Sequence, residues 1–420
     1  MSSKKVFVRD LVDEYSVRAK NFGDHSSFEF FGVSNEDGIT KSKNAAKDKV
    51  EDYKIIEQGC FAYNPYRINV GSIAYLDEDI KGFISPAYVV FKTKPKSIIP
   101  ELLFKFLKSK EGLRQIKLYA RGTVRQALRF EDLCKIELTI PHYDEQVKLF
   151  EKISLTENET IKLNNETDFQ LNIVTQLRQA FLREAMQGKL VPQDKNDEPA
   201  TELLKRIKAE KEKLIVEGKL KKQKPLPEIK PEEIPYQPPN DLIFVRLQDI
   251  CHIEKGNIGI MKAAPGDYPL VTLSEERLSD KDYYFDCKAV IIPIISSAGH
   301  GKAEMKRMHY QEGKFSVGNI LCAVYPFNYE NFNARFLFEY MNNYKHDFFV
   351  KKMRGAANVS LRLDAVGETP VPVVAIKTQN KFEELMQLLD ELEKNINQSK
   401  EETNLLLQTV LREALEGKEK

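Results

Sequence analysis

The tripeptide Asn64-Pro65-Tyr66 is the part of the chain that comes nearest to a catalytic motif. Amino-methyltransferases use a related tetrapeptide, in which Asn or Asp precedes two prolines and an aromatic residue, to hold the target amine and to stack a flipped base. The second proline is missing here, and so is the glycine-rich strand end expected at a binding site for S-adenosylmethionine. A methyltransferase with a degenerate site therefore stays open as a minor alternative.

The other common catalytic signatures are missing from the sequence. No Gly-Lys pair is followed by Ser or Thr, as a phosphate-binding loop requires, and no H-E-x-x-H, G-x-S-x-G, dinucleotide fingerprint or Pro-Asp dipeptide occurs. The five cysteines and six histidines show neither zinc-site spacing nor clustering. We therefore expect a chain that is not an enzyme by itself and that binds neither a metal ion nor a cofactor.

Three short motifs occur twice, in the same order along the chain. Residues 7–9 (FVR) recur at 244–246, residues 121–122 and 128–129 (RG and LR) recur at 354–355 and 361–362, and residues 182–185 (LREA) recur at 411–414. The separations are 237 (244 − 7), 233 (354 − 121) and 229 (411 − 182) residues. Such anchors predict duplicated halves, and hence an approximate two-fold symmetry that a partner must match.

Length, composition and charge limit the number of domains and the cellular compartment that we expect for the protein. With 420 residues, of which 42% are hydrophobic, the chain is long enough for two or three domains. The net charge is +1, but 30% of the residues are charged, and a balanced total can hide basic faces. The first ten residues are polar and no uncharged run approaches about 18 residues, so we expect a soluble, cytoplasmic protein without a membrane partner.

Residues 1–142 and 241–375 each have the sequence pattern of an α+β domain. Short apolar and aromatic runs between turn residues predict strands, and apolar residues at helical spacing predict one helix in each domain. The expected strands are 28–32, 73–76, 87–91, 136–141, 290–295 and 320–325, and the expected helices are 100–110 and 334–343.

Helical sequence follows the first domain. Residues 143–186 lack glycine and proline, and Leu163, Val174, Leu177 and Phe181 recur at helical spacing before Gly188, the expected C-cap. A second helix over residues 200–217 completes a central helical region, 143–218. The lysine- and proline-rich residues 219–240 predict an extended connector.

The last segment, residues 376–420, predicts one long helix from about residue 380 to 416. Positions 385, 389, 392, 396, 399, 403, 406 and 410 alternate three and four apart, as in a heptad seam. We favour antiparallel pairing with the helix at 143–186 over an ordinary amphipathic helix on a globular core. The expected fold class is α+β, with two globular domains separated by two long antiparallel coiled-coil helices and related by a pseudo-two-fold repeat.

Residues 176–200 (QLRQAFLREAMQGKLVPQDKNDEPA) strongly resemble the central region of type I restriction-modification specificity subunits. The resemblance continues through residues 203–214 and 233–236. Residues 60–72 (CFAYNPYRINVGS) and 82–88 (GFISPAY) are similar to motifs of target-recognition domains, and residues 130–133 and 140–141 to their closing segment. The resemblance covers essentially the whole chain and is looser at the start of the second domain.

This resemblance implies a non-catalytic reader of double-stranded DNA. Each of two target-recognition domains would read one half of a split asymmetric site, and the paired helices would set the spacer. Two modification subunits, which bind S-adenosylmethionine and methylate adenine, would dock on the chain, together with restriction subunits that use ATP and Mg²⁺. The alternative is a coiled-coil scaffold with two protein-binding domains and no role in DNA binding.

A DNA reader needs cations for phosphates and amide or guanidinium groups for base edges. We expect Arg121 and Arg354 to contact phosphate and Gln126 and Asn358 to read bases, with a solvated turn as the alternative for each loop. The full set of candidate DNA-binding residues is Tyr63, Asn64, Arg67, Asn69, Arg121, Thr123, Arg125, Gln126, Ser297, His300, Lys302, Lys306, Arg354, Asn358, Ser360 and Arg362.

Overall fold

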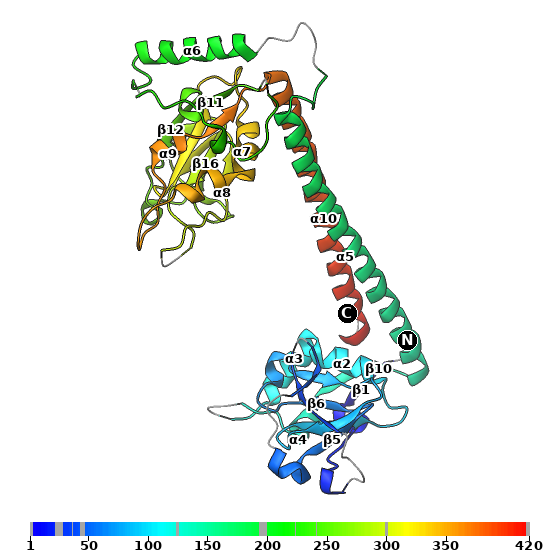
Figure 1. Ribbon diagram of the computed structural model, residues 1–420. Helices are drawn as coiled ribbons and strands as arrows, with labels where there is room; N and C mark the ends of the chain where they lie inside the picture. Colours follow the sequence, from blue (N-terminus) through cyan, green and yellow to red (C-terminus); the bar gives the residue numbers. More distant parts are fainter. Residues whose placement is uncertain are drawn as a thin grey trace. The chain divides into compact units, whose positions relative to one another are not determined.

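The computed structural model of the protein describes residues 3–21, 28–35, 37–42, 47–122, 126–192, 200–222, 224–240, 242–298 and 301–416. The chain divides into two compact units, Met1–Asp168 with Asn397–Lys420, and Phe169–Ile396 (Figure 1). Each unit contains one α+β domain and part of each of the two longest helices.

The α+β domain of the first unit is built on two four-stranded sheets and a two-stranded ribbon. Its strands are β1 (Ser3–Phe7), β2 (Val12–Glu14), β3 (Glu29–Val33), β4 (Ile39–Lys41), β5 (Lys54–Glu57), β6 (Phe61–Tyr63), β7 (Ile73–Tyr75), β8 (Lys81–Ile84), β9 (Val89–Thr93) and β10 (Glu137–Pro141). Its helices are α1 (Val8–Leu11), α2 (Pro100–Lys108), α3 (Lys110–Tyr119) and α4 (Phe130–Leu133). The strand orders are β2-β9-β6-β7, β4-β3-β8-β5 and β1-β10.

The second unit contains a domain of the same kind. Its strands are β11 (Phe244–Arg246), β12 (Cys251–Lys255), β13 (Tyr268–Val271), β14 (Leu278–Asp280), β15 (Phe285–Asp286), β16 (Ala289–Pro293), β17 (His309–Gln311), β18 (Lys314–Val317), β19 (Leu321–Pro326) and β20 (Pro370–Pro372). Its helices are α6 (Ala200–Val216), α7 (Ala334–Asn343), α8 (Lys345–Phe348) and α9 (Leu363–Gly367).

Strand for strand, the two domains share one topology. The orders β12-β19-β16-β17, β14-β13-β18-β15 and β11-β20 repeat those of the first unit with every label raised by ten. The parallel pairing also recurs, between β3 and β8 and between β13 and β18. The duplicated halves predicted from the sequence are therefore confirmed.

The first repeat anchor, however, was aligned wrongly by two residues. The backbone N–H of Val8 donates to Ile136 at 2.9 Å, and that of Leu247 donates to Thr369 at 2.9 Å. Because Ile136 and Thr369 share the separation of the second anchor, Val8 corresponds to Leu247, and Phe7 corresponds to Arg246 rather than to Phe244. A slip of two residues keeps every side chain on the same face of a strand, so alternation of the sequence could not exclude it.

The core of each domain lies between a sheet and the helix that follows it in the chain. In the first domain Phe61 and Phe91 stack with their ring centroids 4.7 Å apart, in one cluster with Phe106 of α2. In the second domain Val290 of β16 lies in one cluster with Phe336 of α7. Burial of each such side chain contributes about 1.5–3 kcal/mol.

The helix expected at 100–110 is two helices. α2 ends at Lys108, and Ser109 is the N-cap of α3, where its hydroxyl accepts a hydrogen bond from the backbone N–H of Gly112 at 3.1 Å. A Cβ at Gly112 would lie 2.1 Å from the carbonyl oxygen of Phe106, so the close turn between the helices needs glycine there. The same glycine lowers helix propensity, which is why α3 was not predicted.

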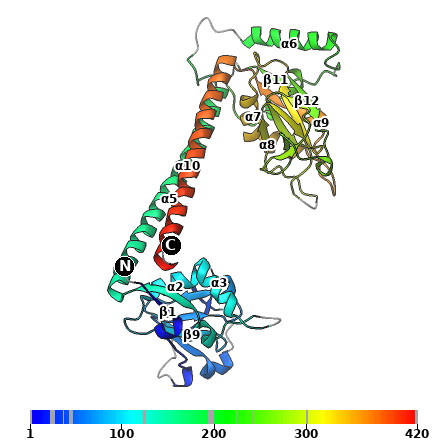
Figure 2. The same cartoon turned by 180° about the vertical axis from the view of Figure 1, so that it is seen from behind.

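Two long helices, α5 (Tyr143–Met186) and α10 (Ile376–Glu416), run side by side in Figures 1 and 2. In the first unit, Asn164 donates to Asn404 at 3.0 Å and Lys400 donates to Asp168 at 2.5 Å. Asp168 comes four residues after Asn164, whereas its partner Lys400 comes four residues before Asn404, so the two helices run antiparallel. This antiparallel pairing and the two α+β domains confirm the expected fold class.

The seam of α10 differs from the predicted heptad positions. The buried residues of the stripe are Phe382, Met386, Leu389 and Ile396, whereas Leu392 is exposed. The ring of Phe382 meets the ring of Phe336 edge-on, with centroids 5.8 Å apart, so α10 packs on α7 as well as on α5. A heptad pattern fitted to two paired helices cannot show this contact with a third helix, α7.

The described residues of the connector 219–240 form neither a strand nor a long helix, but Pro231–Glu233 is a short 3-10 helix and the connector is bound to the second unit. The buried guanidinium of Arg246 donates to the carboxylate of Glu233 at 2.6 and 3.0 Å and to the carbonyl of Pro227 at 3.0 Å. Tyr236 stacks on Tyr344 with ring centroids 5.5 Å apart. The prolines exclude a long helix, and these side-chain contacts hold the segment in place of the regular backbone hydrogen bonds of a helix or a sheet.

Candidate nucleic-acid interface

In the first unit, two of the loops expected to bind DNA meet at their bases. Residues 64–69 follow β6, and two backbone hydrogen bonds of 3.0 and 2.8 Å join Arg121 to Ala127 and close a hairpin whose residues 123–125 lie outside the described residues. The backbone N–H of Leu128 donates to the carbonyl of Pro65 at 3.0 Å. This bond joins the base of the hairpin to the loop after β6.

The second unit repeats this geometry. Residues 354–360 form a hairpin closed by two backbone hydrogen bonds, both of 2.9 Å. The backbone N–H of Leu361 donates to the carbonyl of Ile294, which follows β16, at 2.9 Å. Since β16 is the counterpart of β6, the two hairpins occupy equivalent places.

Each hairpin depends on a glycine directly after its arginine. Gly122 has a φ of 132° and Gly355 a φ of 139°, a region that L side chains rarely adopt. A Cβ at Gly355 would also lie 2.2 Å from the carbonyl oxygen of Asn358. The repeated Arg-Gly pair therefore marks a repeated backbone turn.

In the second unit the loop that follows β16 lies against the hairpin. The backbone N–H of Ser296 donates to the carbonyl of Val359 at 2.9 Å. Gly301 has a φ of 73°, and a Cβ there would lie 2.4 Å from the carbonyl oxygen of Ala356. The structure thus brings together two loops whose residues are about 60 positions apart in the sequence.

Two serine hydroxyls fix the base of this loop. The Ser296 hydroxyl donates to the carbonyl of Lys302 at 2.6 Å and accepts from the backbone N–H of Glu304 at 3.0 Å. The Ser297 hydroxyl accepts from the backbone N–H of Lys306 at 3.0 Å. The backbone that carries both lysines is therefore held by side-chain hydrogen bonds at the surface.

Most of the candidate side chains that the structure describes face solvent. The exposed ones are Arg67, Arg121, Gln126, Lys302, Lys306, Arg354, Asn358, Ser360 and Arg362, and the half-buried ones are Asn64, Asn69 and Ser297. Thr123, Arg125 and His300 lie outside the described residues.

Tyr63 is a correction to the candidate list. It lies in β6, is fully buried, and packs edge-on against Phe91 with ring centroids 6.3 Å apart. A side chain in the core cannot contact DNA. The exposed ring of this segment is Tyr66, which is 58% exposed and which the motif Asn64-Pro65-Tyr66 already contained.

The arginines of the candidate set differ in how their charge is balanced. Arg121 lies 3.0 Å from a carboxylate oxygen of the buried Asp132, which also pairs with Lys135 at 2.7 Å. Arg362 donates two hydrogen bonds, of 2.5 and 3.1 Å, to Asp364. These hydrogen bonds lower the pKa of the Asp364 carboxyl, so Arg362 meets a full negative charge at neutral pH.

Arg354 is held by uncharged groups. One guanidinium nitrogen donates to the carbonyls of Lys351 at 2.6 Å and Met353 at 2.8 Å. These bonds orient the side chain and leave its positive charge without neutralisation by those two partners. Arg354 is therefore better suited to phosphate than its counterpart Arg121.

Folding adds Lys345 to the cations that the sequence singled out. The ammonium group of Lys345, at the start of α8, donates to the carbonyl of Lys306 at 2.9 Å. Burial, and then the charge of Arg307, lower the pKa of Lys345. Arg307 itself lies 2.7 Å from Glu275. These positive charges come from separate elements, so no local motif could have predicted their cluster.

Arg277 is a second residue that the sequence did not reveal. Its guanidinium donates to the side-chain carbonyl of Gln311 at 3.0 Å and lies 3.1 Å from a ring nitrogen of His309. Burial, and then the charge of Arg277, lower the pKa of His309 to about 4. A neutral imidazole can accept from Arg277 near pH 7, so this cation is held in one orientation.

The tripeptide that resembled a methyltransferase motif forms a local turn. The side-chain oxygen of Asn64 accepts from the backbone N–H of Tyr66 at 3.0 Å. Within the described ranges, no group of His, Cys, Asp and Glu side chains is arranged to hold a metal ion. Within the same ranges, no helix has the length and apolarity that crossing a membrane requires.

A family model for the type I restriction modification DNA specificity domain matches residues 13–172 and 239–402. The specificity subunit of the type I restriction enzyme EcoAI of Escherichia coli is 36% identical over 166 residues, which are 38% of this chain and 25% of that protein. That of EcoEI is 51% identical over 80 residues, 19% of this chain and 14% of that protein. That of EcoDI is 25% identical over 345 residues, 77% of this chain and 71% of that protein.

The chain thus spans a quarter or less of the first two of these relatives. Among solved structures, a chain from a type I R-M system superimposes with a TM-score of 0.61 at 14% identity, covering 98% of this chain and 97% of that chain. The HsdS subunit from Thermoanaerobacter tengcongensis gives a TM-score of 0.54 at 14% identity, covering 98% and 96%. At such low identity these likenesses show the fold alone.

Proposed function

The chain belongs to the family of type I restriction-modification DNA specificity domains, and from this premise we propose that it recognises a bipartite, asymmetric DNA site. The α+β domains, residues 1–142 and 241–375, would each read one half-site. The chain would act as the non-catalytic specificity subunit of a type I complex.

The repeated loop geometry is the observation that carries this proposal. Each unit presents an Arg-Gly hairpin that is bonded to the loop after a central strand. Exposed cations and amides project from both places. Two equivalent surfaces with different side chains are suited to two half-sites of different sequence.

We propose that Gln126 and Asn358, both exposed on the hairpins, read base edges. Replacement of either by alanine should relax preference in one half-site by about 1–3 kcal/mol if the amide binds a base in bidentate fashion. Sequencing of methylated sites in cells that carry each variant would show the change. An unaltered motif would remove that residue from the set of base readers.

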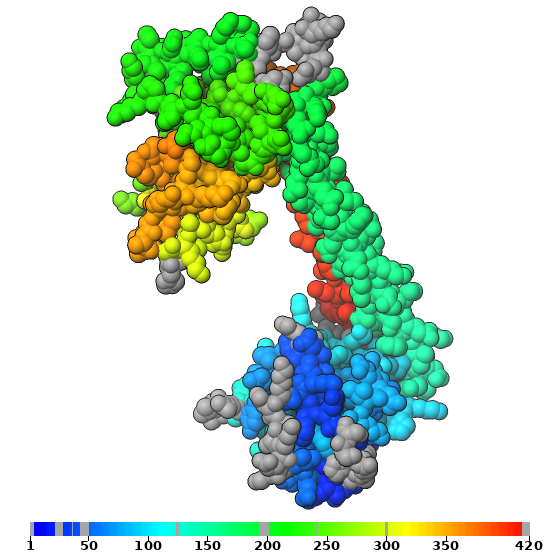
Figure 3. All heavy atoms as spheres, viewed as in Figure 1, coloured from blue at the N-terminus to red at the C-terminus, as the bar shows by residue number. Residues whose placement is uncertain are grey.

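Exposed leucines on the paired helices support the docking of two copies of one partner. Leu163 and Leu406 are 53% and 61% exposed in the first unit, and Leu392 and Leu177 are 45% and 36% exposed in the second. Adding the helix-anchor separation of 229 converts Leu163 to Leu392 and Leu177 to Leu406. The two apolar patches are therefore equivalent, and the outer face of α5 is uncovered in Figure 3.

The partners in this proposal are double-stranded DNA, two modification subunits and restriction subunits. S-adenosylmethionine would be bound by the modification subunits, and ATP and Mg²⁺ by the restriction subunits, rather than by this chain. The complex would act in the cytoplasm. Leu163→Glu combined with Leu392→Glu should prevent copurification of the modification subunit, because a carboxylate at each patch would be costly to bury.

The deciding experiment compares the methylated sites of the source cell with and without this gene. Loss of one bipartite methylated motif is the expected result. In parallel, the complex with modification subunits should bind a duplex that carries this motif more tightly than a duplex of scrambled sequence. A complex that assembles but shows no preference among DNA sequences would favour the scaffold alternative.

A further inference from the structure

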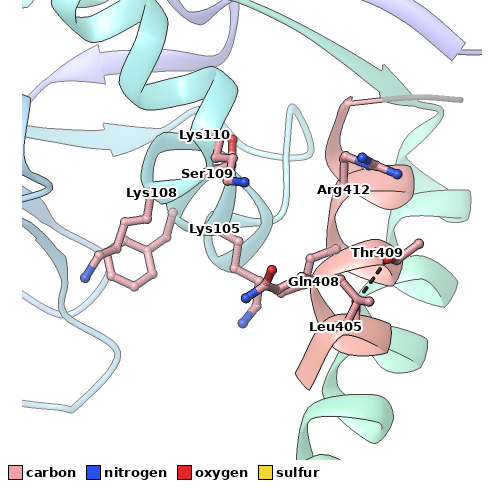
Figure 4. Close-up of a pocket in the computed structure, with 10 residues that line it drawn as sticks. Lys105, Lys108, Ser109, Lys110, Leu405, Gln408, Thr409 and Arg412 are labelled. Atoms are coloured by element: carbon pink, nitrogen blue, oxygen red, sulfur yellow. Dashed lines mark hydrogen bonds between the residues drawn. The ribbon is translucent and has the colours of Figure 1, made fainter. Parts of the chain in front are cut away.

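A basic groove opens in the first unit between the α2–α3 junction and the last turns of α10 (Figure 4). Four cationic side chains line it: Lys105, Lys108, Lys110 and Arg412. Phe104, Leu405 and Leu411 add apolar side chains to its lining. Among the lining residues that the structure describes, none carries a carboxylate.

The equivalent place in the second unit shows how such a surface can be covered. α7 corresponds to α2, because the buried residues 336, 337, 340 and 341 repeat the buried residues 102, 103, 106 and 107. Because α7 is one residue longer than α2, the residue at the junction is Ser109 in the first unit and Tyr344 in the second, and each is the N-cap of the helix that follows. Tyr344 is covered by the ring of Tyr236, which belongs to the connector.

The covering segment has a recognisable chemistry. Residues 231–236 (PEEIPY) place two glutamates and an aromatic ring on a short, proline-stiffened stretch. One of the glutamates, Glu233, pairs with the buried Arg246. In this domain, therefore, a connector segment covers the helix junction with the ring of Tyr236, while the carboxylate of Glu233 anchors the segment to Arg246.

The first unit is more basic at the equivalent positions. Lys105 and Lys108 stand where α7 has Glu339 and Asn342. Lys105 is partly balanced by Glu157 at 2.5 Å, and Lys108 lies over the Phe104 ring at 5.3 Å. The N-terminus of α3 adds a positive helix dipole at the same place.

We propose that this groove binds an extended, acidic segment of a partner protein. An aromatic side chain of that segment would cover the α2–α3 junction beside Phe104, and its carboxylates would pair with Lys108, Lys110 and Arg412. The inference concerns a protein contact, and it does not depend on DNA recognition by the hairpins.

The test uses the full chain and a fluorescein-labelled synthetic peptide of residues 231–238 (PEEIPYQP), followed by fluorescence anisotropy. The peptide should bind, and raising the salt concentration should weaken it. Lys110→Glu combined with Arg412→Glu should weaken binding about tenfold or more, because two attractions become repulsions. Lys117→Glu, a single charge reversal on an exposed position of α3 outside the groove, should leave the affinity unchanged.

Peptide variants separate the two components of the contact. Replacing the tyrosine of the peptide by alanine, or both of its glutamates by glutamine, should each weaken binding. Circular dichroism of the charge-reversed chain checks its fold, and Lys110→Gln with Arg412→Gln provides a milder second variant that should also weaken binding.

Three outcomes would overturn the proposal. The first is no binding of the peptide at millimolar concentration, and the second is equal loss in the Lys117→Glu control. The third is displacement of the peptide by a short duplex DNA, with the charge-reversed chain also losing DNA affinity. That result would assign the groove to DNA and would leave the proposed function itself standing.

Discussion

At the scale of single residues, the two hairpin arginines have different electrostatic surroundings. Arg121 faces the buried Asp132 at 3.0 Å, whereas Arg354 donates to two neutral carbonyls. A phosphate bound by Arg354 meets a cation whose two hydrogen-bond acceptors are neutral, but a phosphate bound by Arg121 is also repelled by the carboxylate of Asp132. Arg354→Gln should therefore lower the slope of log affinity against log salt by about one, and Arg121→Gln by less.

The measurement is a salt titration of DNA binding for both variants. Lys117→Gln, on an exposed position of α3, is the matched loss of one charge outside the hairpins. Equal slopes for all three variants would exclude a phosphate contact by either arginine.

Ser296 tests positioning without any change of charge. Its hydroxyl makes hydrogen bonds to the backbone of Lys302 and Glu304, at 2.6 and 3.0 Å. Ser296→Ala should weaken DNA binding by about 0.5–1.5 kcal/mol while the salt slope stays unchanged, because the loop loses order and no cation is removed. Ser296→Thr should restore affinity, and a changed slope would show that Ser296 acts in another way.

The candidate residues show what the sequence could and could not predict at this scale. Arg121 and Arg354 were found because both copies kept an Arg-Gly turn. Tyr63 was misjudged because an aromatic residue beside a polar loop is as consistent with a core strand as with a stacking ring. Lys345 was not predicted, because its approach to Lys306 depends on tertiary packing.

At the scale of elements, one glutamine ties each long helix to its domain. Gln146, near the start of α5, is buried; its side-chain oxygen accepts from the backbone N–H of Ile99 at 3.0 Å, and its amide donates to the carbonyl of Pro141 at 3.1 Å. Gln379 of α10 makes the equivalent bonds, at 2.9 and 2.7 Å. The first turn of each helix thereby fixes the start of a domain helix and the end of a closing strand.

Gln146→Leu should lower the free energy of unfolding of the first unit by about 1–3 kcal/mol, since the buried N–H of Ile99 and the half-buried carbonyl of Pro141 both lose the hydrogen bond to this side chain. Urea unfolding followed by circular dichroism measures the change. Lys148→Gln, an exposed position on the same helix, is the control and should have little effect. A loss no larger than the control would mean that water or a side-chain shift satisfies both groups.

Elements were predicted well where the pattern was local and long. The ranges of α5 and α7 agree with the expected 143–186 and 334–343. The seam of α10 was less predictable, because a helix that packs on both α5 and α7 buries a wider stripe than a coiled-coil heptad. Leu392 and Leu406, predicted for the seam but exposed on α10, are the α10 members of the two proposed docking patches.

At the scale of the whole molecule, the duplicated chain predicts separable control of half-sites and spacer. The boundaries between the compact units fall inside both long helices, after Asp168 in α5 and after Ile396 in α10. A four-residue helical insertion at both points keeps the pairs Asn164–Asn404 and Arg178–Asp390 within their own units. Each inserted segment adds about 6 Å of helix and about 40° of net rotation.

Since DNA rises about 3.4 Å per base pair, the methylated motif should keep both half-sites and gain about two base pairs of spacer. A four-residue insertion in the connector after Gly218, outside both long helices, should leave the spacer unchanged. Sequencing of methylated sites in cells that carry each variant measures both. Changed half-sites with an unchanged spacer would contradict the proposal that the helices set the distance between the half-sites. Recognition of the half-sites would then depend on the residues at the insertion points. Complete loss of methylation by a complex that still assembles would show that the helices also orient the two domains. A seven-residue insertion changes the rotation by only about 20°. It should then restore methylation, with a spacer about three base pairs longer than in the original motif.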